Sequence, residues 1–142
     1  MKKIALLALM AVVALVGSGQ AVAKSSHSKS HKCTPQKVAY VVSGKLVSGS
    51  LTKESDGTYS GTLTVHVTKT NKYGKADKGT DVTYTLDHAK GKLHGEDPGA
   101  LVANSKVHLS GKITKLAKKC DQTGFTATRT IKKFDIKPPK TK

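Results

Sequence analysis

The sequence has few aromatic and few acidic residues. It contains no tryptophan, aromatic residues make up 4% of its 142 positions, and Asp plus Glu number 9. Glycosidase chemistry requires two carboxylates held in one cleft, and the sequence offers no such pair among these acids. A G-x-S-x-G motif, which marks the nucleophile of many serine hydrolases, is also missing. We therefore expect neither enzymatic activity nor a cofactor.

Positive charge is what the chain has in excess. Lys plus Arg number 25, which gives a formal net charge of +16 at pH 7, and Arg129 is the only arginine. A guanidinium suits bidentate recognition of bases and carboxylates, whereas the ammonium group of lysine acts as a hydrated point charge. The excess of lysine favours non-specific attraction to polyanions, or a surface charge that serves only solubility and the protection of sheet edges.

The first 23 residues have the order of a secretory signal peptide. Lys2 and Lys3 precede an apolar run at residues 4–16, and a small-x-small cleavage site follows at residues 21–23. The alternative is a membrane anchor, but this run covers only about 20 Å of a hydrocarbon core about 30 Å thick. Cleavage near Ala23 would lower the charge from +16 to +14 by removing the two lysines. We expect a secreted or cell-envelope protein with no transmembrane segment in its mature chain.

Export makes a disulfide between Cys33 and Cys120 the expected state of the two cysteines, because the compartment outside the cytoplasm is oxidising. Closing so long a loop contributes up to about 4 to 5 kcal/mol. A metal site that includes His27, His31 and Cys33 is the competing interpretation. Neighbouring lysines oppose a cation there, and a disulfide would remove the thiolate ligand. We therefore expect no metal.

Five segments alternate apolar and polar residues, as strands with one buried face do. They cover residues 38–51, 59–68, 81–87, 106–114 and 125–136. In the last segment the phase slips near Lys133, so that Phe134 and Ile136 stay on the core side only through a bulge. Residues 98–104 are the only candidate helical turn, because Pro98 suits a first turn.

This pattern predicts an all-β fold, a five-stranded OB-like small barrel whose first strand bends at a glycine. A small β-sandwich is the alternative. After the signal peptide at residues 1–23, we expect a flexible basic leader at 24–36, a single β-barrel domain at 37–137 and a basic tail at 138–142. We expect the protein to be a monomer.

Several strand segments resemble those of a family of secreted bacterial domains of unknown function that form OB-like barrels. They are Gly44 and the segments 61–65 (GTLTV), 81–83 (DVT), 105–111 (SKVHLSG) and 125–128 (FTAT). The resemblance spans residues 38–136 and implies the same barrel fold. The lysine excess and the cysteine pair depart from the family pattern, and the family supplies no activity to carry over.

Lysines gather in two links between the predicted strands, and we predict that these bind anions. The first group surrounds Tyr73, a candidate for stacking, and comprises Lys69, Lys72, Lys75 and Lys78; the second comprises Lys112, Lys115, Lys118 and Lys119. In an OB-like barrel these two links would lie at opposite rims, so that the groups would not form one groove. Tyr40 is the other candidate for an exposed aromatic platform.

The function expected from these features is that of a secreted, non-enzymatic binding module attracted to anionic polymers through lysine-rich loops. The polymer would be a cell-envelope polymer, an acidic polysaccharide or extracellular nucleic acid. The alternative is a structural or accessory envelope protein that binds a protein partner at a sheet edge. A small enzyme would need His88, His94 or Glu96 in one pocket with a nucleophile or a metal. The alternative interpretation is that these three are hydrated loop residues without a catalytic role.

Overall fold

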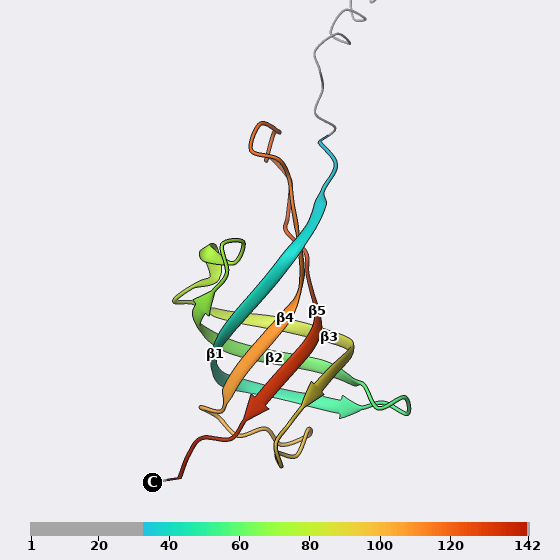
Figure 1. Ribbon diagram of the computed structural model, residues 1–142, viewed down its shortest axis with the longest axis vertical. Helices are drawn as coiled ribbons and strands as arrows, with labels where there is room; N and C mark the ends of the chain where they lie inside the picture. The colour runs from blue at the N-terminus through green and yellow to red at the C-terminus, as the bar shows by residue number, and fades with distance from the viewer. Residues whose placement is uncertain (1–32, 142) are drawn as a thin grey trace, which may run out of the picture. The chain divides into compact units, whose positions relative to one another are not determined.

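The computed structural model describes residues 33–141. The predicted signal peptide lies outside the described residues, as do His27 and His31, the histidines of the competing metal-site interpretation. Five strands and one short 3-10 helix form the described part of the chain (Figure 1). In chain order they are β1 (Gln36–Lys53), β2 (Tyr59–Thr70), η2 (Lys75–Asp77), β3 (Asp81–Lys92), β4 (Lys106–Lys115) and β5 (Arg129–Lys137). Within residues 33–141, no helix has the length and apolar character needed to cross a membrane.

The strands close into one barrel in the order β1-β2-β3-β5-β4, and β4 pairs back to β1. Neighbouring strands are antiparallel except β3 and β5, which run parallel. This ring confirms the predicted five-stranded OB-like barrel. The alternative β-sandwich is wrong, because β1 pairs with both β2 and β4 and the described strands form a single sheet.

β1 is the longest strand and passes from one neighbour to the next. Residues 36–45 pair with β4, and residues 42–53 pair with β2. The register against β2 shifts between Ser43 and Gly44, where a side chain in place of Gly44 would collide with the backbone carbonyl of His66. Gly44 therefore lies in the part of β1 that pairs with both β4 and β2, and Figure 1 shows β1 curving around the barrel.

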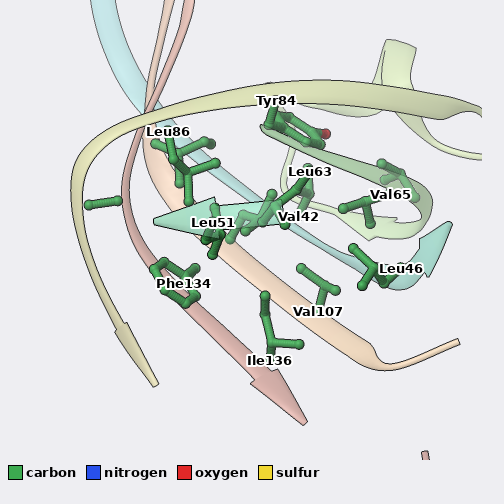
Figure 2. Packing of buried hydrophobic residues seen from close by; sticks show 14 of the residues in the cluster. Val42, Leu46, Leu51, Leu63, Val65, Tyr84, Leu86, Val107, Phe134 and Ile136 are labelled. Carbon is green, nitrogen blue, oxygen red and sulfur yellow. The ribbon is translucent and has the colours of Figure 1, made fainter. Parts of the chain in front are cut away.

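The inward side chains of all five strands fill the barrel with one hydrophobic core (Figure 2). The alternation predicted for β2, β3 and β4 places Leu63, Leu86 and Leu109 in this core. Tyr40 was predicted to be an exposed platform, and this is wrong, because its side chain is fully buried. The segment around it is apolar on both faces, so the sequence pattern alone did not show which face would be buried.

β5 contains the predicted bulge. Ser110 of β4 faces Lys133, and the next residue, Gly111, faces Ile131, so that Lys132 has no partner in the β4–β5 register. This extra residue returns Phe134 and Ile136 to the core. The strand begins at Arg129, so residues 125–128, which were predicted to belong to it, lie outside it.

The predicted helical turn at residues 98–104 does not form. This connection runs beside β1 instead, with hydrogen bonds from the Leu51 amide to the Pro98 carbonyl (2.7 Å) and from the Asn104 amide to the Leu46 carbonyl (2.8 Å). The Glu96 carboxylate accepts a further bond from the Val102 amide at 3.0 Å. These backbone groups are therefore not available for the bonds within a helical turn.

The disulfide between Cys33 and Cys120 is present, as predicted, with the two Cα atoms 5.6 Å apart. Cys33 precedes β1, and Cys120 lies in the loop that joins β4 to β5. The bond therefore fastens the start of the barrel to this loop, which extends beyond the barrel beside the first residues of β1 (Figure 1).

Candidate functional site

A groove of about 570 Å³ crosses the outer wall of the barrel over β2, β1, β4 and β5. Four lysines line it, and we call it the lysine groove: Lys45, Lys69, Lys106 and Lys137. Its other polar side chains are those of Ser43, Thr68, His108 and Asp135. They point outward because strand residues alternate, and the intervening residues, such as Val107, are buried in the core.

Three of these lysines stand side by side on adjacent strands. Lys45 of β1 lies opposite Lys106 of β4, and Lys106 lies opposite Lys137 of β5. His66 of β2 continues the row on the other side of Lys45. Neighbouring strands are about 4.8 Å apart, so the row presents three cations at a short, regular interval. All three lysines are exposed.

Like charges directly opposite each other destabilise a sheet. The row therefore raises the energy of the isolated barrel, and the repulsion is relieved when an anion lies across the three ammonium groups. Such an arrangement is typical of a surface that binds a multiply charged anion.

Among the described residues, Asp135 is the only acidic one that lines the groove. Its Oδ2 lies 3.1 Å from His94 Nε2, and its Oδ1 lies 3.9 Å from Lys137 Nζ. The hydrogen bond with His94 holds the pKa of the Asp135 carboxyl below its usual value, so the group is ionised at neutral pH. It offsets part of the charge at one end of the row and leaves the Lys45 end without an acid in the groove.

Ser43 and His108 form a polar pair in the groove, next to the row of lysines. Their hydrogen bond joins Ser43 Oγ and His108 Nδ1 at 2.8 Å, across a directly opposed pair of β1 and β4 residues. Within the described residues, no carboxylate forms a hydrogen bond with the His108 ring. The pair therefore lacks the third group that orients the base of a serine-hydrolase triad. Its chemistry is that of hydrogen-bonding groups beside a cationic row.

The predicted anion-binding lysines are distributed over four places. Lys69 lines the groove, whereas Lys112, Lys118 and Lys119 are exposed elsewhere on β4 and its following loop. Lys75 begins η2, and Lys78 follows it. Lys72 and Lys115 both lie over the Tyr73 ring, with Nζ at 4.8 Å and 5.0 Å from its centroid.

The expectation that the two groups lie at opposite rims is wrong, because Lys72 and Lys115 come from different groups and meet at Tyr73. The β2–β3 link folds over the end of the barrel, where Gly74 approaches the Tyr40 ring. The inner face of the extended β4–β5 hairpin borders the same place. Tyr73 is half-buried against the core, with the two ammonium groups over its ring.

A buried polar network lies beneath this junction. Tyr40 donates a hydrogen bond to Asp77 Oδ2 at 2.5 Å, and the Tyr84 hydroxyl lies 2.8 Å from that of Tyr40. Arg129 binds the same carboxylate through Nε and Nη2. Burial, followed by the bond to Asp77, raises the pKa of Tyr40 far above its usual value, and burial also raises that of Tyr84.

The residues considered for a small enzyme each bind a different partner. His94 bonds to Asp135, whereas Glu96 accepts bonds from the Ser105 hydroxyl (2.5 Å) and the Val102 amide. His88 lies 3.3 Å from Asp56. Within residues 33–141, no group of three His, Cys, Asp or Glu side chains is arranged to hold a metal ion.

No protein-family model matches this chain, and no curated protein or solved structure matches it. The site must therefore be interpreted from its own geometry. Sequence analysis missed Lys45, Lys106 and Lys137 as a group. Their outward position follows from strand alternation, but their alignment depends on register between strands far apart in sequence.

Proposed function

We propose that the protein is an exported, non-enzymatic module that binds an anionic polymer along the lysine groove. The observation that supports this is the row of Lys45, Lys106 and Lys137 on three adjacent strands. An extended polymer with regularly spaced negative charges places successive charges on successive ammonium groups. Release of its condensed counterions supplies most of the binding free energy.

The chemistry of the groove favours polymers recognised by charge. Lysine offers point charges without the fixed fork of arginine, and Ser43 and Thr68 add hydroxyl groups for anionic oxygens. The described lining of the groove contains no Phe, Tyr or Trp, the side chains that offer the largest stacking surface to a base. A cell-envelope polyphosphate or an acidic polysaccharide therefore fits the groove better than single-stranded nucleic acid.

The test compares two variants with equal net charge. One carries Lys45→Gln, Lys106→Gln and Lys137→Gln in the groove; the matched control carries Lys75→Gln, Lys118→Gln and Lys119→Gln in the links. Binding to immobilised polyphosphate and to heparin is measured over a range of salt concentrations. For the unmodified protein, four groove lysines predict a slope of log K against log salt near −3.

The groove variant should bind at least about tenfold more weakly at low salt, with a slope nearer −1. The control should keep the original slope. An equal loss in both variants would mean that diffuse charge carries the binding, and a loss in the control alone would assign it to the lysine links. Either result would contradict binding in the lysine groove. Binding that does not depend on salt would contradict recognition of a polyanion.

One observation favours a second function, that of an accessory protein with a partner at a sheet edge. Residues 81–85 of β3 pair with β2, but their other side has no strand partner among the described residues, because pairing with β5 begins at Leu86. An extended peptide adds to such an edge through backbone hydrogen bonds. A partner retained from envelope extract at high salt and released by Thr83→Pro would support this function.

A further inference from the structure

A second cavity, of about 330 Å³, lies at the mouth of the barrel between the β2–β3 link and the β4–β5 hairpin. It shares no lining residue with the lysine groove. The volume is near the lower end of the range for small-molecule sites, about 300 to 1,000 Å³, and barrel mouths are among the places where such sites occur.

Apolar side chains form most of the wall of this cavity. Ile113 comes from the end of β4 and Leu116 from the residue that follows it, Phe125 and Ala127 from the residues before β5, and Tyr73 from the β2–β3 link. Phe125 and Ala127 have the inward phase predicted from the sequence. They are only half-buried because the hairpin extends beyond the other strands, and no strand covers its inner face there.

Cationic groups stand at one side of these apolar walls. Arg129 uses Nε and Nη2 to bind Asp77, and among the described residues its Nη1 has no hydrogen-bond partner. The guanidinium lies 5.9 Å from the Tyr40 ring centroid, and its side chain is 30% exposed. Asp77 and Tyr40 therefore fix the orientation of Arg129 before any ligand arrives. Lys115, whose ammonium group lies over Tyr73, lines the same cavity.

We propose that this cavity binds a small carboxylic acid that carries one aromatic or branched aliphatic group. The apolar group would pack against Phe125 and Ile113, and the carboxylate would accept hydrogen bonds from Arg129 Nη1 and Lys115 Nζ. Asp77 already balances the charge of Arg129, so among the residues that line the cavity only Lys115 contributes an unbalanced charge, which suits a monoanion. The small volume suits a free acid of the size of one amino acid. This site does not depend on the polymer groove.

The test uses N-acetyl-phenylalanine as probe and its amide as the neutral analogue. Titration of the full mature chain, followed by NMR shifts of the Phe125 and Ala127 amides, should show that the acid binds at least about tenfold more tightly than the amide. Phe125→Ala should weaken binding of the acid about tenfold. Lys115→Gln should reduce the preference for the acid over the amide severalfold, and it leaves the Arg129–Asp77 pair in place.

The groove variant with Lys45, Lys106 and Lys137 replaced by Gln serves as the control and should bind the acid unchanged. Equal affinity for acid and amide would overturn the proposal, as would unchanged binding in Phe125→Ala. No shifts at about 10 mM acid would also overturn it. Binding only of a longer peptide that ends in phenylalanine would assign the cavity to a protein terminus and reject the small-molecule ligand.

Discussion

Arg129 donates two hydrogen bonds to Asp77, from Nη2 to Oδ1 at 2.7 Å and from Nε to Oδ2 at 3.0 Å. Asp77 ends η2 in the β2–β3 link, and Arg129 begins β5. The pair therefore fastens a link to a strand with which it shares no sheet pairing.

Asp77→Ala should lower the free energy of unfolding by about 2 to 4 kcal/mol, because it leaves a half-buried guanidinium and the Tyr40 hydroxyl without their acceptor. The value lies below that for a fully buried pair because Arg129 is 30% exposed. Urea denaturation measures it. Asp81→Ala, which breaks the exposed pair with His66, should cost under about 1 kcal/mol. Similar losses for the two variants would contradict the role of Asp77.

Tyr40 and Tyr84 should remain protonated for as long as the protein is folded. Their folded-state pKa values are raised by burial, so their contribution to stability is complete below pH about 10 and is lost as the pH rises above that. The tyrosinate absorbance of these two phenols should therefore appear only when the protein unfolds in alkali. In Tyr84→Phe, the part of the absorbance change that appears only on unfolding should halve, because Tyr40 is then the one remaining buried phenol of the pair. Full ionisation of all four tyrosines in the folded protein would contradict the buried network.

Asp135→Asn should strengthen binding of an anionic polymer about twofold to fivefold at low salt, because it removes the only carboxylate that lines the groove. The matched control is Asp121→Asn, in the β4–β5 loop, which changes the net charge equally but lies outside the groove. An equal gain in both variants would show that net charge, rather than position in the groove, determines affinity.

Lys106→Gln should raise the free energy of unfolding by about 0.3 to 1 kcal/mol at low salt while it weakens polymer binding, because Lys106 is the middle member of the row. The gain should disappear at high salt, where the repulsion is screened. Thermal denaturation at two ionic strengths measures this. Lys118→Gln, in the exposed loop, should leave stability unchanged. A loss of stability in Lys106→Gln would show that the row is not repulsive.

Reduction of the disulfide, or replacement of both cysteines by serine, should lower the free energy of unfolding by about 2 to 4 kcal/mol, because the long loop between Cys33 and Cys120 regains its freedom in the unfolded state. Polymer affinity should change less than twofold, because the groove residues lie on paired strands away from this bond. Loss of polymer binding in a folded, reduced protein would contradict the independence of the lysine groove from the disulfide.

Alternation of apolar and polar residues was enough to predict the barrel, since each of the five segments contains a strand and the bulge that keeps Phe134 in the core follows from a slip in phase. The prediction was wrong for Tyr40 and for residues 98–104. In both cases contacts distant in sequence accompany the outcome: the buried Tyr40 hydroxyl bonds to Asp77 and Tyr84, and β1 supplies the hydrogen-bond partners of the 98–104 connection.

The candidate sites were harder to predict than the fold. Lys69, one of the predicted anion-binding residues, lines the groove, but grouping lysines by proximity in sequence missed Lys45, Lys106 and Lys137, which only the register brings together. Topological reasoning separated Lys72 from Lys115, whereas the β2–β3 link folds across the barrel end to join them at Tyr73. The path of a link is determined by packing, which residue order does not reveal.

The spacing of Lys45, Lys106 and Lys137 is set by the backbone hydrogen bonds of three strands and not by flexible loops. The backbone positions from which these side chains extend therefore keep one separation, about 4.8 Å between neighbouring strands, whatever the ligand. Two polymers with equal total charge would then be distinguished by the distance between their repeating units. Selectivity of this kind needs no contact specific to a sugar or a base.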